Sequence, residues 1–183
     1  MKTICLYFEI HQITHLKRYR FFEIGSDHYY YDDYANEQGI NEVAERSYIP
    51  VLNTLIDMAK NNGGAFKVAL SISGVALEQL EIHAPAVIEL LHELNATGCC
   101  EFICEPYSHG LSSLANEDCF REDVENMRKK VKDYFGQDPK IFRNSSLIYD
   151  NEIGGIVASM GFKGMLVEGA KHVLGWKSPH YLY

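Results

Sequence analysis

Apolar positions along this chain fall into two kinds of segment. Five short, nearly continuous apolar runs are separated by longer stretches in which apolar residues recur every three or four positions. Continuous runs are typical of parallel strands buried on both faces, and the longer period is typical of amphipathic helices. Strict alternation of the two predicts an α/β fold, either an open parallel sheet or a barrel. The expected strands are 4–10, 66–72, 99–104, 140–148 and 163–167.

Four helical stripes have recognisable start and stop signals. Pro50 and Pro85 stand in the first turn of two of them, and a glycine follows each stripe. Proline fits the first turn of a helix because its missing N–H would have no partner there, and glycine is favoured just past the end. The apolar stripes are Leu52, Leu55, Ile56 and Ala59; Val87, Leu90, Leu91 and Leu94; Phe120, Val124, Met127, Val131 and Tyr134; and Ile153, Ile156, Val157 and Met160.

Length and charge narrow the range of functions. The 183 residues can form one well-buried domain, whereas a complete (β/α) barrel takes about 250. The net charge is −8 and the basic residues form no stripe, so we expect neither nucleic acid nor a membrane surface as a partner. No apolar run approaches the length of a membrane span.

Cysteine usage and the first residues favour a cytoplasmic protein. The apolar run at the start of the chain is short, is followed by Glu9 and has no small-residue cleavage site. It is therefore interpreted as a first strand and not as a signal peptide. The cysteines are odd in number and lack the paired spacing of zinc sites, so we expect reduced, buried thiols. They are Cys5, Cys99, Cys100, Cys104 and Cys119.

Several segments carry a family resemblance. Residues 142–149 read Phe-Arg-Asn-Ser-Ser-Leu-Ile-Tyr. This run resembles the Phe-Arg-Asn-Thr-Glu-Leu-Ile-Tyr strand of α-amylase-type members of glycoside hydrolase family 57, in which Glu is the nucleophile. Ser146 stands at that place. Other segments that look like this branch are Tyr7–Gln12, where Ile13 replaces a following proline, Ser71–Gly74, Gly98–His109, Met160–Gly164, Glu168–Ala170 and Leu174–Pro179.

The resemblance implies a fold and a substrate. The family fold is an incomplete (β/α) barrel of seven strands followed by a helical region, and this chain resembles its first half. We therefore expect residues 1–183 to be the N-terminal part of such a domain, with about five parallel strands and outer helices, in a longer protein. The implied ligand is an α-1,4-glucan or maltooligosaccharide. The family's general acid, an Asp, lies beyond the part resembled, and we expect neither a metal nor another cofactor.

The missing carboxylate bears directly on activity. A retaining glycosidase needs two carboxyl groups about 5 Å apart, one as nucleophile and one as acid. The hydroxyl of Ser146 stays protonated near neutral pH, and neighbouring Ser145 cannot simply replace the lost group. We therefore predict an inactive chain related to an α-amylase. The alternatives are a non-catalytic glucan-binding protein and a metal-dependent barrel like the polysaccharide deacetylases.

Strand alternation selects the candidate binding residues. It puts Glu101 and Glu105 on one face of their strand, and places His11 and Glu105 at carboxyl ends, where such barrels collect their sites. By resemblance, His11 and Glu101 are sugar-contacting positions, and Glu105 and His109 belong to the same signature. Two alternatives remain open: the acids merely form ion pairs, and Arg143 either orients a pocket carboxylate or serves as their structural partner.

Two features of the first connection have open interpretations. His11 and His15 have a spacing that can chelate a metal, but His11 ends a strand, so we do not expect a chelate. The connection from Gln12 to about Asn41 is rich in aromatic and acidic residues, and it is either a glucan platform or simple packing over the barrel end. An incomplete barrel also leaves strand edges open, through which we expect self-association.

Overall fold

The computed structural model describes residues 4–178, in which five parallel strands form one open sheet. β1 pairs with β2 and β2 with β3, while β4 pairs with β5. A parallel bridge between Cys104 and Phe142 joins the two groups. The spatial order therefore follows the chain order, as in the wall of a barrel, and the predicted incomplete (β/α) barrel is confirmed. The strands are β1 (Tyr7–Ile10), β2 (Val68–Ile72), β3 (Cys100–Phe102), β4 (Ile141–Arg143) and β5 (Gly164–Leu166).

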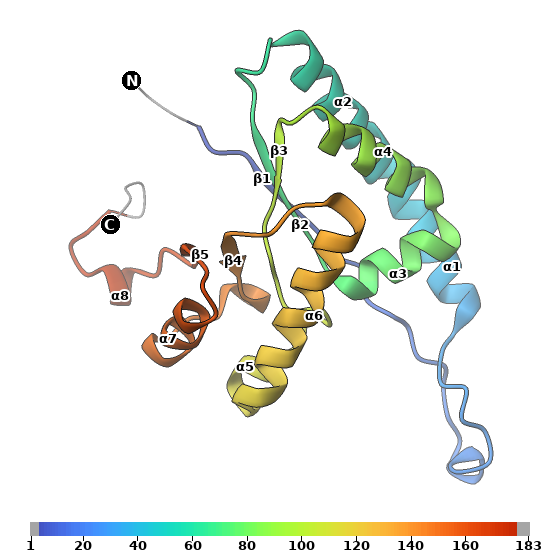
Figure 1. The fold of residues 1–183 in the computed structure, drawn as a ribbon. Coiled ribbons are helices and arrows are strands. Elements are labelled where there is room, and N and C mark those ends of the chain that lie inside the picture. Colours follow the sequence, from blue (N-terminus) through green and yellow to red (C-terminus); the bar gives the residue numbers. More distant parts are fainter. Residues whose placement is uncertain (1–3, 179–183) are drawn as a thin grey trace.

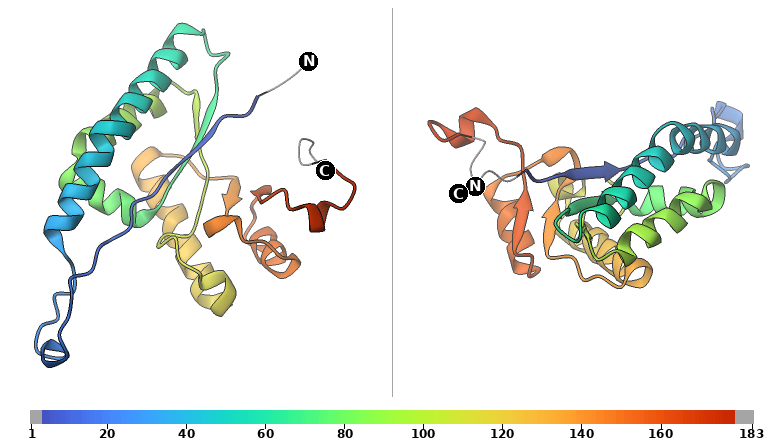
Figure 2. Two further views of the ribbon diagram at one scale, coloured as in Figure 1. Left: turned by 180° about the vertical axis from the view of Figure 1, so that it is seen from behind. Right: turned by 90° about the horizontal axis from the view of Figure 1, so that it is seen from above.

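Helices follow the strands along the chain and cover one face of the sheet (Figures 1 and 2). The predicted prolines Pro50 and Pro85 stand in the first turns of α2 and α4. Gly136 ends α6 in a left-handed conformation. The helices are α1 (Asp33–Val43), α2 (Ile49–Asn61), α3 (Gly74–His83), α4 (Pro85–Ala96), α5 (Ser112–Ala115), α6 (Glu117–Phe135), α7 (Asn151–Ser159) and α8 (Lys171–Leu174). The 3₁₀ turns are η1 (Phe21–Glu23) and η3 (Ser145–Leu147), and η2 (Ala44–Tyr48) is a π-helical segment between α1 and α2.

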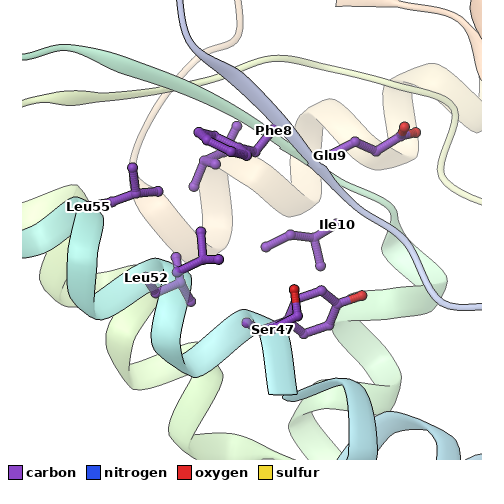
Figure 3. A pocket seen from close by; sticks show the side chains of 9 residues that line it. Phe8, Glu9, Ile10, Ser47, Leu52 and Leu55 are labelled. Carbon is purple, nitrogen blue, oxygen red and sulfur yellow. The ribbon is translucent and has the colours of Figure 1, made fainter. Parts of the chain in front are cut away.

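The core lies between the sheet and these helices. Phe102 of β3 stacks on Phe135 of α6, with ring centroids 3.9 Å apart. On β1, Phe8 and Ile10 lie toward α2 around a small cavity of about 90 Å³. Glu9 also lines it, but its carboxylate points away from α2 (Figure 3). Alternation along β1 thus sends Phe8 and Ile10 to the helices, and Tyr7 and Glu9 to the uncovered face.

The fold differs from the expectation in how strands end. The strand predicted over 140–148 ends at Arg143, because Asn144 turns the chain. Its side chain accepts a hydrogen bond from the Ser145 N–H and donates to the Ile148 carbonyl, at 3.0 Å each. The 3₁₀ turn η3 follows, and Ser146 has a left-handed backbone with φ of 52°. Hydrophobic character alone did not reveal this turn.

Two helices and two cysteines also depart from the prediction. α3 was not expected, and α1 occupies part of the predicted connection 12–41. The expectation of five buried thiols is wrong for Cys5 and Cys119, which are exposed, while Cys99, Cys100 and Cys104 are buried. The final residues, 179–183, including the end of the Leu174–Pro179 segment, lie outside the described part of the chain.

Residues 12–32 form an arm that leaves the carboxyl end of β1 and projects from the body (Figure 1). Leu16 and Tyr31 form an antiparallel bridge, and the Lys17 N–H donates to the Tyr30 carbonyl at 3.0 Å. Phe21 and Phe22 at the tip are 80% and 91% exposed, so simple burial does not account for all of its aromatic residues. Within residues 4–178, none of the helices combines the length and apolar character that a bilayer crossing requires.

Candidate active site

Polar side chains from four adjacent strands meet in one row at the carboxyl end of the sheet. The register pairs Ile10 with Ile72 and Cys104 with Phe142. One residue further on, each strand therefore contributes to the same row, which runs across the uncovered face. Its members are His11, Ser73, Glu105 and Arg143.

Glu105 is the buried centre of this row. It has no solvent-exposed surface, and Ser71 donates a hydrogen bond to its Oε2 at 2.5 Å. The Tyr7 hydroxyl lies 2.6 Å from the Ser71 hydroxyl, and burial raises the pKa of Tyr7 to about 12. His109 Nδ1 lies 3.2 Å from the other carboxylate oxygen, Oε1. Both oxygens of this buried carboxylate therefore have partners, as burial of a charge requires.

Glu9 brings a second carboxylate to the same place. The Arg143 guanidinium donates to Glu9 Oε1, and His109 Nδ1 lies 3.5 Å from that oxygen. Burial raises the pKa of Glu9, and the Arg143 charge opposes this shift. The hydrogen bond to Glu105 raises the pKa of His109, together with the charges of both carboxylates. Two acids thus face one fixed cation and one imidazole that favours its charged form.

His11 has a contrasting environment. Its Nδ1 lies 2.8 Å from the Ser73 hydroxyl, and its ring stacks on that of His109 with centroids 4.0 Å apart. Burial lowers the pKa of His11, and the His109 charge lowers it further. The stacked pair therefore consists of one imidazole that favours the neutral form and one that favours the charged form.

The loop carrying His109 is fastened at two points. The Tyr107 carbonyl accepts hydrogen bonds from the N–H groups of Gly74 and Val75 at the start of α3, and the Tyr107 ring covers Gly74 so closely that a Cβ there would overlap it. The Ser108 hydroxyl donates to the Asp123 carboxylate of α6 at 2.9 Å. These contacts hold His109 in a left-handed conformation, with φ of 52°, that a free loop would rarely adopt.

Sequence comparison decides the family. The model of glycosyl hydrolase family 57 matches residues 5–183. The chain belongs to glycoside hydrolase family 57. A Methanocaldococcus jannaschii protein named "Putative alpha-amylase" is 40% identical over 182 residues, which cover 96% of this chain. The chain spans 38% of the length of that relative.

Solved structures support the same fold. The 4-α-glucanotransferase from Thermococcus litoralis matches with a TM-score of 0.63 at 20% identity, over 72% of this chain and 20% of that one. A family 4 carbohydrate esterase from Streptomyces lividans, solved in complex with acetate, matches with a TM-score of 0.51 at 12% identity, over 89% of this chain and 61% of the esterase. At these identities the likeness concerns the fold alone.

Ser146, which the resemblance places where the family has its nucleophile, lies just past the row. Ser146 follows β4 at the same end of the sheet and is exposed, while Ser145 is buried and its hydroxyl has no hydrogen-bond partner among the described residues. The structure thus brings a hydroxyl, and no carboxylate, to this strand end. Ser146 follows the carboxyl end of β4, as His11 follows that of β1, and its part in the site stays a prediction.

The structure does not bring every predicted residue together. His11, Glu105, His109 and Arg143 are in contact through the network, but Glu101 is four residues before Glu105, about 13 Å along the strand. Glu101 is exposed and lines a depression at the amino ends of the strands. The sequence interpretation also missed Ser71 and Ser73. The sequence feature that could have revealed them is a pair of serines, two positions apart, at the end of an otherwise apolar run.

The same cluster contains an arrangement that can hold a metal. One ligand atom each of Glu9, Glu105 and His109 lies within 4.8 Å of the others, and within the described residues this is the group with such geometry. His15 is not part of it. Arg143 already contacts Glu9, so a cation bound there would meet a guanidinium beside one of its ligands.

Proposed function

We propose that this chain binds an α-glucan at the carboxyl end of its sheet and does not hydrolyse it. The observation that carries the proposal is the network around Glu105, next to a strand end where Ser146 replaces the family's carboxylate. His11, His109 and Arg143 offer hydrogen-bond donors and ring surface to a sugar, and of these His11 is the position that the resemblance marks as sugar-contacting. The name of the 40% identical relative supports this substrate class.

The absence of hydrolysis follows from how the remaining carboxylates are used. Glu105 is fully buried and bonded on both oxygens, and Glu9 is held by Arg143. Neither is a free acid beside Ser146. A serine hydroxyl cannot supply the charge that meets an oxocarbenium-like transition state, and loss of a nucleophile lowers turnover by about 10⁴-fold or more.

The experiment separates binding from catalysis. Maltotriose is titrated into the protein by calorimetry, and reducing ends are measured after long incubation with the same sugar. We expect binding without release of reducing ends above the buffer control. Glu105→Gln is expected to weaken binding at least tenfold, because the amide cannot accept hydrogen bonds on both sides. Glu89→Gln, an exposed change of the same kind on α4, is the matched control. Hydrolysis, or no binding, refutes the proposal.

A second candidate function is deacetylation assisted by a divalent cation. It is favoured by the arrangement of Glu9, Glu105 and His109 and by the fold likeness to a carbohydrate esterase. The test is the metal content of the purified protein, followed by acetate release from an acetylated chitooligosaccharide. Stoichiometric metal that is lost in Glu105→Gln supports this candidate, and metal-free protein that binds maltotriose excludes it.

We further propose that the protein is cytoplasmic and that the isolated chain self-associates. The cysteines within residues 4–178 are all unpaired, as suits a reducing compartment. Among the described strands, β1 and β5 each pair on one side, and open edges invite pairing with another chain. Light scattering at increasing protein concentration tests this, and a mass that stays at one chain contradicts it.

A further inference from the structure

A second hollow lies away from the row, between the arm and α3. It has a volume of about 300 Å³, at the lower end of the range for small-molecule sites. The arm, the start of α1 and one side of α3 form its walls, so three separate segments of the chain create it. Its lining includes Tyr29, Tyr31, Asp33, Glu78, Gln79 and Ile82.

Two tyrosines form the aromatic wall of this groove. Tyr29 and Tyr31 are about half exposed, at 52% and 50%, and their rings lie at 78° with centroids 6.0 Å apart. Tyr30 between them turns to the other side of the arm and contacts Tyr19, with ring centroids 5.0 Å apart. Large rings left open to solvent beside polar groups are typical of a surface that meets a ligand.

Acceptors and amides complete the lining. Tyr29 donates to Asp33 Oδ1 and Tyr107 donates to Glu78 Oε1, so these hydroxyls hold the carboxylates in place at the groove. No cation pairs with either acid in the described part of the chain, so the groove disfavours anions.

Gln79 supplies an independent observation. The residue is 7% exposed, and its amide nitrogen donates to the Gln12 carbonyl at 3.0 Å. Its amide oxygen is buried and has no partner among residues 4–178. A buried acceptor without a donor is costly, and such groups are usually explained by a ligand or a water. Here the orphan acceptor belongs to a residue that lines the groove.

We propose that this groove is a second contact site for a neutral, polyhydroxylated chain, namely the continuation of the α-glucan bound at the strand ends. This inference rests on the proposed function, because the ligand class comes from it. Thr14, which lines the groove, is three residues from His11, so at most about 11 Å separates their backbones. A long oligosaccharide can reach both places, whereas a disaccharide held at the row cannot.

The test compares maltose with maltoheptaose by calorimetry. Tyr31→Ala is expected to weaken maltoheptaose binding about tenfold and to leave maltose binding unchanged, because a stacking surface is lost only for the longer sugar. Tyr31→Phe keeps the ring and is expected to bind within about twofold of the wild type. Tyr34→Ala, at a 76% exposed tyrosine outside the groove lining, is the matched control.

A second variant keeps the test independent of the arm. Ile82 is 72% exposed on α3, and Ile82→Arg places a long side chain in the groove without touching the arm's own contacts. It should also lower maltoheptaose affinity selectively. Wild-type affinity in both Tyr31→Ala and Ile82→Arg overturns the inference. If Glu105→Gln abolishes binding of both sugars while these two variants change nothing, the strand-end function stands and the groove does not. If the two groove variants weaken maltoheptaose binding while Glu105→Gln changes nothing, the groove remains as a binding site and the strand-end site does not. If the wild type binds neither sugar, both proposals are wrong.

Discussion

The two faces of β3 and its continuation contrast sharply within four residues. Phe102 and Cys104 face the helices, where they are buried among apolar side chains. Ile103 and Glu105 face the other way, and Glu105 is equally inaccessible but is buried among hydrogen-bonding groups. The helix-covered face contributes to stability through packing, which depends on the volumes of its side chains. The other depends on specific partners, because a buried carboxylate without them is strongly unfavourable.

This contrast explains where chemistry can reside in the chain. The apolar face is covered by the helices, and the buried side chains of strands and helices form one continuous core. The polar face is completed only when several strands align, since the partners of Glu105 come from β2 and from the loop that carries His109. The candidate site is therefore a property of the whole sheet.

The largest expected effect is on the packed face. Phe102→Ala removes a fully buried ring stacked on Phe135 and should cost about 3–5 kcal/mol in the free energy of unfolding. Phe21→Ala makes the same change at an 80% exposed position of the arm and should stay within about 0.5 kcal/mol. Urea unfolding followed by circular dichroism measures both. Equal losses would contradict the assignment of the core to the helix-covered face.

A smaller effect is expected at the boundary between the faces. Gly74→Ala would force the Tyr107 ring aside and should cost about 1–3 kcal/mol, with loss of glucan binding because His109 is on the same loop. Gly155→Ala is the control, since its Cβ would enter open space in α7 and should stabilise the fold by about 0.5–1 kcal/mol. Unchanged stability and unchanged maltotriose binding in Gly74→Ala would show that the loop is not held as described.

The apolar pattern predicted the packed face well. Strands and amphipathic helices follow from period alone, and the stripe from Phe120 to Val131 is indeed the buried face of α6. α3 was missed because apolar residues are spread around it, so no single stripe marks it. The turn after β4 was missed because it depends on one side chain, Asn144, whose hydrogen bonds are visible only in three dimensions.

The polar face was predicted less completely. Alternation and resemblance together singled out His11, Glu105 and Arg143, and these lie in one row. The same reasoning included Glu101. Its side chain is on the same face of the strand as Glu105, but it lies at the opposite end of the strand. Alternation within one strand shows which face a side chain is on. Which residues of neighbouring strands lie beside it depends on the register of the sheet. The partners Ser71 and Tyr7 likewise became evident only once the register was known.

A subtler test concerns protonation at the polar face. His109 should titrate above the ordinary histidine value of about 6.5 and His11 below it, as measured by NMR of the ring protons. The contribution of His109 to stability is therefore present below the unfolded pKa and is lost as pH rises through its raised folded pKa. For His11 the sign is opposite. Folding favours the neutral ring, so its contribution is present above the unfolded pKa and is lost as pH falls from there through the lowered folded pKa. Glu105→Gln should lower the pKa of His109, and identical values for the two rings would contradict the geometry.

The smallest expected effect is a null result. Ser146→Glu restores the Glu that the family resemblance places at this position, in a run whose residues 142–144 and 147–149 already match. We nevertheless expect no release of reducing ends from maltooligosaccharides by this chain. A nucleophile alone is insufficient, because a second carboxyl must protonate the leaving oxygen. Glu9 is bound to Arg143 and Glu105 is buried with both oxygens occupied, so neither is available as that acid. Release of reducing ends above the Ser146→Gln control would show that one of these two carboxylates serves as the acid. The buried network would then be a reactive group and not only a set of structural partners.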